Sequence, residues 1–342
     1  MGEYARSLAI ARAASRRWPG AAIHFVLSRE APYAADAPYP KTLLASSPTF
    51  HSAAVIELLE TWRPDVVIFD NAGRTAQLRA ARRLGARIVY ISARRRQRRK
   101  AFRWRWMRLI DEHWIAYPEF IAGGAGLLER LKLRLAGQPT LRYLDVILSD
   151  ADPAQRDVVL ARAGCAADTF VLVVPGGGTG HPGAHDAVNQ FMAAARALAA
   201  AGVPTVYVGP GATAVDAEPN WHPQGPLPQA ELAELMRSAR LIIANGGSTL
   251  LQAIACGTAC IAVPIAKDQA ERIRRCVAAG AAQAAPLHTD GIVQAARGLL
   301  QNEAQRAALA ERARHLGLAD GVKVAIRALG DLVEPAHETM GA

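Results

Sequence analysis

Residues 241–269 read LIIANGGSTLLQAIACGTACIAVPIAKDQ, and this stretch decides the fold. An apolar run, Leu241 to Ala244, has the length of a buried strand and is followed by the glycine pair Gly246-Gly247. A helical pattern then extends from Ser248 to Cys256, and a second apolar run, Ala259 to Val263, comes after it. Strand, glycine turn, helix and strand in this order predict a βαβ unit with parallel strands.

A second strand with a glycine cluster lies upstream of this unit. The apolar run Phe170 to Val174 leads through Pro175 into the glycines Gly176, Gly177 and Gly178, followed by Thr179 and Gly180. Glycines at such a turn let backbone N–H groups approach a ligand, and a helix N-terminus adds partial positive charge that suits phosphate. A tight connection would use the same residues, so both interpretations stay open. Two such turns in one domain would suit a diphosphate.

Short apolar runs alternate with longer stretches of helical period along the whole chain. This alternation predicts an α/β architecture, and we expect two Rossmann-like domains with parallel sheets that face each other across a cleft. We place the first domain at residues 1–150 and the second at residues 165–318, with the stretch Ser149 to Asp168 as the boundary. The strands expected in the first domain are Ala22 to Ser28, Asp65 to Phe69, Arg87 to Ser92, His113 to Ala116 and Leu144 to Leu148.

The first domain begins with a helical pattern instead of a strand. Met1 leads directly into Gly2 and Glu3, and apolar residues at helical spacing follow. A glycine turn that opens a helix normally follows the first strand of a Rossmann unit. Two interpretations remain open: the first strand is missing because it belongs to residues ahead of Met1, or the domain starts with a helix.

The positive charge of the chain is concentrated in its first half. The net charge is +10; residues 1–150 hold 25 Lys/Arg and 13 Asp/Glu, whereas residues 151–342 hold 15 and 17. Such a basic field indicates an anionic partner. The apolar runs are too short to span a bilayer, and the N-terminus has no secretory pattern, so we expect a cytoplasmic protein. Cys256 and Cys260 lack a second pair of metal ligands nearby, and we expect no metal.

One segment, Ala93 to Ile110, combines basic and aromatic residues and holds nine of the 25 basic residues. This composition suits an anionic membrane interface or an anionic acceptor. Stacking on single-stranded nucleic acid is a disfavoured alternative, and a solvated helix with an aromatic side in the core is a further one. The residues expected to contact membrane or acceptor are Arg94, Arg95, Arg96, Arg98, Arg99, Lys100, Phe102, Trp104 and Trp106.

The stretch Asn245 to Ala259, with Ile261 to Pro264 and Lys267-Asp268-Gln269 after it, resembles the donor site of GT-B glycosyltransferases. It is most similar to family 28, the enzymes related to the N-acetylglucosaminyltransferase that makes lipid II. The resemblance covers roughly residues 170–285 and implies a nucleotide-sugar donor held by the second domain, with inverting, metal-independent transfer. It also implies that a C-terminal helix within residues 319–342 packs back on the first domain.

The resemblance assigns donor-binding roles to particular residues. The diphosphate would meet the second glycine turn, and Gln269, with Asp268 before it, would bond hydroxyls of the transferred sugar. The family's acidic residue, which grips the ribose, falls on Gln252, and an amide lacks the charge-assisted strength of a carboxylate. The full set of expected donor contacts is Gly176, Gly177, Gly178, Thr179, Gly246, Gly247, Ser248, Thr249, Gln252, Asp268 and Gln269.

An inverting transfer also needs a group that takes the proton of the attacking hydroxyl, and a carboxylate or a histidine is the usual choice. Asp70 ends an expected strand, at the edge of the sheet where Rossmann domains bind ligands, and is the first candidate. Glu3 lies in the N-terminal glycine turn and is the second. His181 and His185, beside the first glycine cluster, are further candidates.

These observations favour a glycosyltransferase that moves a sugar from a nucleoside diphosphate, expected to be a UDP-sugar, to a lipid-linked or otherwise anionic glycan acceptor. We expect it to sit peripherally on the inner face of the membrane. A nucleotide-sugar hydrolase and a non-catalytic glycosyltransferase-like scaffold are the alternatives. A sugar-nucleotide epimerase is disfavoured because Leu251-Gln252 is not the acidic pair expected in its donor loop.

Overall fold

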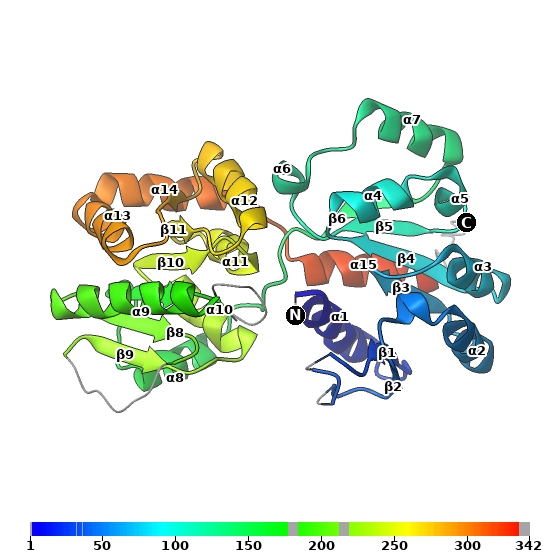
Figure 1. Ribbon diagram of the computed structural model, residues 1–342, viewed down its shortest axis with the longest axis horizontal. Coiled ribbons are helices and arrows are strands. Elements are labelled where there is room, and N and C mark those ends of the chain that lie inside the picture. The colour runs from blue at the N-terminus through cyan, green and yellow to red at the C-terminus, as the bar shows by residue number, and fades with distance from the viewer. Residues whose placement is uncertain (1, 32, 36, 177–183, 212–218, 335–342) are drawn as a thin grey trace, which may run out of the picture. The chain divides into compact units, whose positions relative to one another are not determined.

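The computed structural model describes residues 2–31, 33–35, 37–176, 184–211 and 219–334 (Figure 1). The chain divides into two compact units. Unit 1 comprises residues 1–147 and 319–342, and unit 2 comprises residues 148–318. Among the described residues, no helix is both long and apolar enough to cross a membrane.

Unit 2 is built around a six-stranded sheet in which all neighbouring strands are parallel. The strand order is β9-β8-β7-β10-β11-β12, so the direction of winding reverses between β7 and β10. In open α/β sheets ligands bind at this reversal, outside the carboxyl ends of the strands. The strands are β7 (Val171–Val174), β8 (Thr205–Val208), β9 (Trp221–Gln224), β10 (Leu241–Asn245), β11 (Cys260–Val263) and β12 (Gln283–Ala284).

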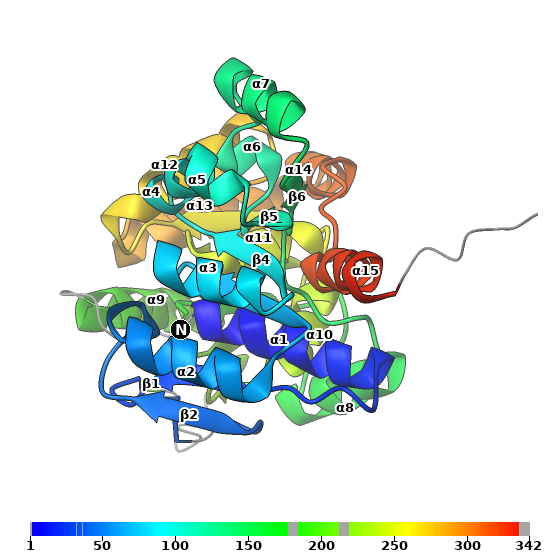
Figure 2. The ribbon, with the colours of Figure 1, turned by 90° about the vertical axis from the view of Figure 1, so that its right-hand side faces the viewer.

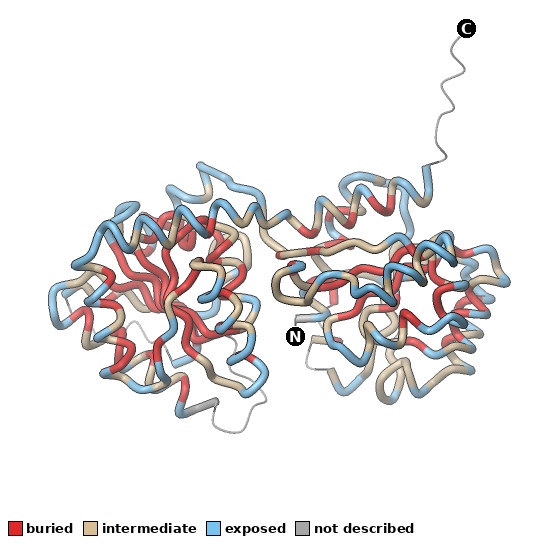
Figure 3. The backbone as a smooth tube through the Cα atoms, turned by 90° about the horizontal axis from the view of Figure 1, so that it is seen from above, coloured by how far each residue is buried: buried red, intermediate tan, exposed pale blue. Residues whose placement is uncertain are grey.

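Continuous apolar runs make the central strands of unit 2, because helices cover both faces of the sheet. β7, β10 and β11 are buried along their whole length, as the red tube of Figure 3 shows. Val173, Ile243 and Ile261 share one core with residues of α9 and α13. The helices are α8 (Pro153–Ala163), α9 (Ala184–Ala200), α10 (Gln229–Ser238), α11 (Ser248–Ala255), α12 (Lys267–Ala278), α13 (Thr289–Gln301) and α14 (Glu303–His315).

Unit 1 has a four-stranded parallel sheet, in the order β3-β4-β5-β6, and a separate parallel pair, β1 with β2. Its strands are β1 (Phe25–Ser28), β2 (Lys41–Leu44), β3 (Val66–Asp70), β4 (Arg87–Ser92), β5 (Glu112–Ile115) and β6 (Thr140–Tyr143). Its helices are α1 (Gly2–Arg17), α2 (Ser52–Trp62), α3 (Thr75–Arg83), α4 (Arg95–Ala101), α5 (Trp104–Met107), α6 (Glu119–Ala122), α7 (Leu127–Ala136) and α15 (Gly321–Val333), with a 3-10 turn at Pro48–Phe50. Helix α7 stands at the outer edge of this unit (Figure 1, Figure 2).

Strand β4 is the centre of unit 1, since its alternate residues enter two cores. Ile88 and Tyr90 pack with α3, α4 and α5, whereas Val89 and Ile91 pack with α1 and α15. Helix α15 follows unit 2 in sequence but belongs to unit 1, where Asp331 pairs with Arg142 of β6 at 2.9 Å. The last described helix therefore closes the core of the first unit.

Most expected strands are present, but the strand predicted at Leu144 to Leu148 is wrong. The strand in this region is β6, which ends at Tyr143, before the predicted range begins. Asp145 adopts a left-handed backbone with φ 45°, which does not fit an extended strand. The boundary stretch Ser149 to Asp168 contains α8, which begins at Pro153 and is capped by the Asp152 carboxylate. Helix α8 packs on α10 and is therefore part of unit 2.

The core of unit 1 contains a neutral histidine. His113 on β5 is fully buried; its Nε2 lies 2.9 Å from Ser92 Oγ, and its Nδ1 has no hydrogen-bond partner. Burial lowers the pKa of His113 to about 3, because the charged ring would lose its solvation.

We expect unit 1 to lose stability as the pH falls below about 6.5, the pKa of an exposed histidine. In that range His113 binds a proton in the unfolded chain but not in the folded chain, so acid favours unfolding. At pH 5 the effect is up to about 2 kcal/mol. Urea unfolding of the wild type and of His113→Gln, at pH 7 and pH 5, measures it. An equal loss in both proteins would contradict the assignment.

Candidate functional site

The two glycine turns of unit 2 lie side by side at the point where the strand order reverses. Val174 of β7 is paired in register with Ala244 of β10. Pro175 and Gly176 follow the first strand, while Gly246 and Gly247 follow the second. The sequence therefore places both turns at the carboxyl edge of the sheet, where the fold predicts a ligand.

The side chain of Asn245 ties these two turns together. Its Nδ2 donates a hydrogen bond of 2.7 Å to the carbonyl oxygen of Pro175, and its Oδ1 accepts one of 2.6 Å from the backbone N–H of Gly247. Asn245 is buried; its bond to Pro175 is buried and its bond from Gly247 is partly buried, so losing either bond is costly. The sequence-based site did not include this residue, although it precedes the glycine pair directly.

The glycines are required because the bridge leaves no room for side chains. A Cβ atom on Gly176 would lie 1.9 Å from Asn245 Nδ2, and the backbone of Gly176 has φ +85°. A Cβ atom on Gly247 would lie 2.6 Å from Asn245 Oδ1. Gly176 and Gly247 therefore have a structural role in addition to the predicted donor contact.

Helix α12 supports the second turn from behind. Gln269 is buried, and its Oε1 accepts hydrogen bonds from the N–H groups of Gly246 at 3.1 Å and Ile265 at 3.0 Å. Arg272 donates to the carbonyl oxygen of Gly246 and lies 3.8 Å from Asp268. Arg272, a cation at the turn, was missed because the sequence shows only a charged helix there.

Helix α11 begins at Ser248, directly after the second turn, and no side chain caps it. Its N-cap residue is Gly247, which has no side chain that could cap the helix. Ser248 is exposed, and Thr249 and Gln252 are partly exposed. The N–H groups of an uncapped first turn and the helix dipole favour an anion at this position.

Several predicted residues cannot be placed in this site. Gly177, Gly178, Thr179 and His181 lie outside the described residues, and the side chain of His185 is likewise outside them. Asp268 projects into solvent, with 72% of its side chain exposed. Within the described part of the chain, no group of three or more His, Cys, Asp or Glu residues could hold a metal ion.

In unit 1 the two carboxylates predicted as bases come together where α1 begins and β3 ends. Asp70 accepts hydrogen bonds from Arg6 Nη2 at 2.6 Å, Arg6 Nε at 3.1 Å and Ser7 Oγ at 3.0 Å. Burial raises the pKa of Asp70, while Arg6 and Ser7 act in the opposite direction. The carboxylate of Asp70 is thus held in a nearly buried ion pair.

Glu3 is linked to the same strand end through Asn71. Asn71 Nδ2 donates to Glu3 Oε1 at 2.7 Å, and Asn71 Oδ1 accepts from the N–H of Ala93 at 2.7 Å. Asn71 has a left-handed backbone, φ 53°, which turns its side chain back over the end of the strand. Glu3 itself is exposed.

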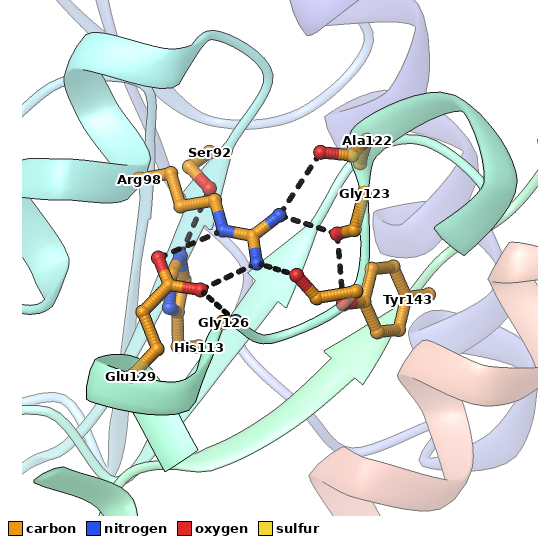
Figure 4. Close-up of polar contacts among 9 residues, drawn as sticks. Ser92, Arg98, His113, Ala122, Gly123, Gly126, Glu129 and Tyr143 are labelled. Atoms are coloured by element: carbon orange, nitrogen blue, oxygen red, sulfur yellow. Dashed lines mark hydrogen bonds and ion pairs between the residues drawn. The ribbon is translucent and has the colours of Figure 1, made fainter. Parts of the chain in front are cut away.

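The basic aromatic segment is not one exposed face, and the membrane prediction is wrong for part of it. Phe102 and Trp106 are buried, and Trp106 Nε1 donates to Thr75 Oγ1 at 2.9 Å. Arg98 is turned inward to Glu129 and to the carbonyl oxygens of Gly123 and its neighbours (Figure 4). The exposed members are Arg94, Arg95, Arg96, Arg99 and Trp104.

Lys100 is also turned toward the protein. Its Nζ donates to the carbonyl oxygen of Gly73 at 2.7 Å and lies 4.2 Å from the centre of the Trp106 ring. Burial, with Arg74 and other cations nearby, lowers the pKa of Lys100 to about 8. Lys100 therefore fixes the loop after β3 instead of presenting a free charge.

Comparison with known proteins finds similarity in structure but not in sequence. No protein-family profile matches the chain, and no curated protein matches its sequence. Solved structures match over nearly the whole length. MurG of Acinetobacter baumannii has 17% identity and a TM-score of 0.60, with 94% of each chain covered. LpCGTa, solved in complex with UDP, has 14% identity and a TM-score of 0.61, with 96% of each chain covered.

A third similar structure is the putative UDP-N-acetylglucosamine 2-epimerase from Listeria monocytogenes, with 14% identity and a TM-score of 0.59. The match covers 96% of this chain and 92% of the epimerase chain. Glycosyltransferases and epimerases therefore share this architecture. The chain has the GT-B fold, as its sequence predicts.

We expect Asn245→Ala to destabilise unit 2 by about 1–3 kcal/mol, because it leaves the buried carbonyl of Pro175 and the partly buried N–H of Gly247 without partners. Urea unfolding measures the loss. Asn302→Ala is the matched control: this exposed asparagine caps α14 through one bond, to the N–H of Gln305, and should cost about 1 kcal/mol. Equal losses for the two variants would show that the bridge does not stabilise the turns.

Proposed function

We propose that this protein transfers a sugar from a nucleoside diphosphate, a UDP-sugar, to a lipid-linked or anionic glycan acceptor, with inversion and without a metal. The observation that carries the proposal is the pair of glycine turns at the strand reversal, locked by Asn245 beside the uncapped start of α11. We further propose that it works in the cytoplasm, at the inner face of the membrane.

The donor site is suited to a diphosphate leaving group. As the bond to the sugar breaks, negative charge grows on the phosphate, and N–H groups fixed in advance stabilise it at no cost of reorganisation. The first turn of α11 supplies such groups, and Arg272 supplies a cation beside the same turn. Gln269 would hold the turn through Oε1 while its Nε2 meets sugar hydroxyls.

For the acceptor, we propose that Glu3 takes the proton of the attacking hydroxyl. Its Oε1 accepts a hydrogen bond from Asn71, which orients the carboxylate, and the residue as a whole is exposed. Asp70, the first candidate from sequence, has its oxygens occupied by Arg6 and Ser7. We propose that this ion pair fixes the start of α1 and thereby positions Glu3.

Charge at the start of α11 separates donor binding from stability. Ser248→Asp should stabilise the helix slightly, because an acid at a helix N-terminus is favourable, and should repel a diphosphate. We expect UDP-sugars to raise the melting temperature of the wild type and of Ser248→Ala, in EDTA as well as in Mg²⁺, but not that of Ser248→Asp. Gly247→Asp should also abolish the response.

A wild type that responds to no nucleotide would overturn the donor assignment. A response that requires Mg²⁺ would overturn metal independence alone. Products measured from the UDP-sugar that binds then separate the activities: free sugar without an acceptor indicates a hydrolase, an epimeric UDP-sugar indicates an epimerase, and binding without any product indicates a scaffold.

Two carboxylate variants test the proton acceptor. We expect Glu3→Gln to lower kcat by about 10²–10⁴-fold with unchanged donor binding and unfolding, because the residue is exposed. Asp70→Asn should instead lower stability, since it leaves Arg6 buried without its counter-charge. The assay is UDP release in the presence of a lipid-linked glycan fraction. Full activity of Glu3→Gln, with lost activity in a stably folded Asp70→Asn, would transfer the role to Asp70.

A further inference from the structure

Helix α7 turns a stripe of leucines outward. Four of its five leucines, Leu127, Leu128, Leu131 and Leu135, are 79%, 74%, 53% and 68% exposed. At about 100° per residue, these positions fall within one side of the helix. Scattered exposed leucines are ordinary, but four on one short helix form a patch that needs a partner.

The orientation of α7 is fixed by polar contacts on its other side, most of which are partly buried. Glu129 pairs with Arg98 at 2.7 Å and also accepts from the N–H of Gly126, where the helix begins (Figure 4). Lys132 donates to the carbonyl oxygen of Phe102 at 3.1 Å. Arg98 further bonds three consecutive carbonyl oxygens ahead of the helix, those of Ala122, Gly123 and Gly124. The leucines therefore face away from the protein because the opposite face is tied to it.

The surroundings of the leucine stripe are cationic. Arg130 and Arg134 are exposed on α7 beside the leucines, and the only acidic residue of the helix, Glu129, is already paired with Arg98. Helix α5 contacts α7 and exposes Trp104, with 42% of its surface accessible, next to exposed Arg105. The patch thus combines apolar side chains, an aromatic ring and uncompensated positive charge.

We propose that α7 is the element by which this protein docks on an anionic lipid bilayer, with the leucines in the boundary between head groups and acyl chains. An amphipathic helix with an apolar face and flanking Lys/Arg binds such a surface in this way. A second copy of the chain is disfavoured as occupant, because it would bring Arg130 and Arg134 against the same charges. This proposal depends on the proposed function in one respect only, that the acceptor lies at a membrane.

Flotation of the full-length protein with vesicles tests the proposal without any sugar transfer. The vesicles are phosphatidylcholine alone or phosphatidylcholine with one third phosphatidylglycerol. We expect the wild type to float with the anionic vesicles. Leu128→Ser/Leu131→Ser should lower the partition coefficient tenfold or more, and Arg130→Gln/Arg134→Gln should lower it by about fivefold for each charge. Val158→Ser, at a position 65% exposed on α8, is the matched control and should bind as the wild type does.

Vesicle binding that is unchanged in the leucine variant, or a wild type that binds neither vesicle, would overturn the proposal. Analytical ultracentrifugation gives a second readout: a wild-type dimer that the leucine variant dissociates would assign the patch to self-association instead. The variants alter exposed side chains, so unfolding should stay as in the wild type. UDP-sugar binding in unit 2 is measured separately, and its failure would leave the vesicle result standing.

Discussion

The buried side chain of Asn245 is the constraint on which the two glycine turns of unit 2 depend. Parallel strands β7 and β10 are held together by their backbones only as far as Ala244, and beyond that point the two turns need another connection. One amide supplies it, with its N–H donating to Pro175 and its oxygen accepting from Gly247. Because both bonds converge on one side chain, glycine is required on either side of it. The bridge thus explains in part why the sequence has glycine at positions 176 and 247.

In unit 1, an ion pair connects the end of a strand to the helix beside it. At the end of β3, Asp70 is tied to Arg6 of α1, and Asn71 is tied to Glu3 on the same helix. The start of α1 is therefore attached to the strand by one buried ion pair and one exposed hydrogen bond. The two carboxylates therefore differ in their surroundings: Asp70 is nearly buried and held by Arg6 and Ser7, whereas Glu3 is exposed and accepts a hydrogen bond from Asn71.

The fold was predictable from sequence because its signals are local and repeated. The runs that form β7, β10 and β11 are apolar throughout, as strands covered on both faces must be. Helical period, by contrast, does not tell which face is buried. The sequence predicts Phe102 and Trp106 at a membrane interface, but both are buried in the core. Four leucines of α7, in contrast, are exposed. That difference is set by Arg98, whose partners stand about 30 residues away, and no local pattern encodes such a pairing.

Under the proposed function, the two units would recognise charge by different physical means. Unit 2, residues 148–318, holds 13 basic and 14 acidic residues, so a diphosphate held there would rely on oriented N–H groups and on a cation close to the turn. Unit 1, residues 1–147 and 319–342, holds 27 basic and 16 acidic residues, and many of the basic ones are exposed arginines around α4, α5 and α7. Salt screens exposed charges strongly and pre-oriented backbone dipoles at short range much less. Binding to an anionic surface would then weaken with ionic strength while the donor site stays competent, so the protein could leave a membrane without losing its nucleotide.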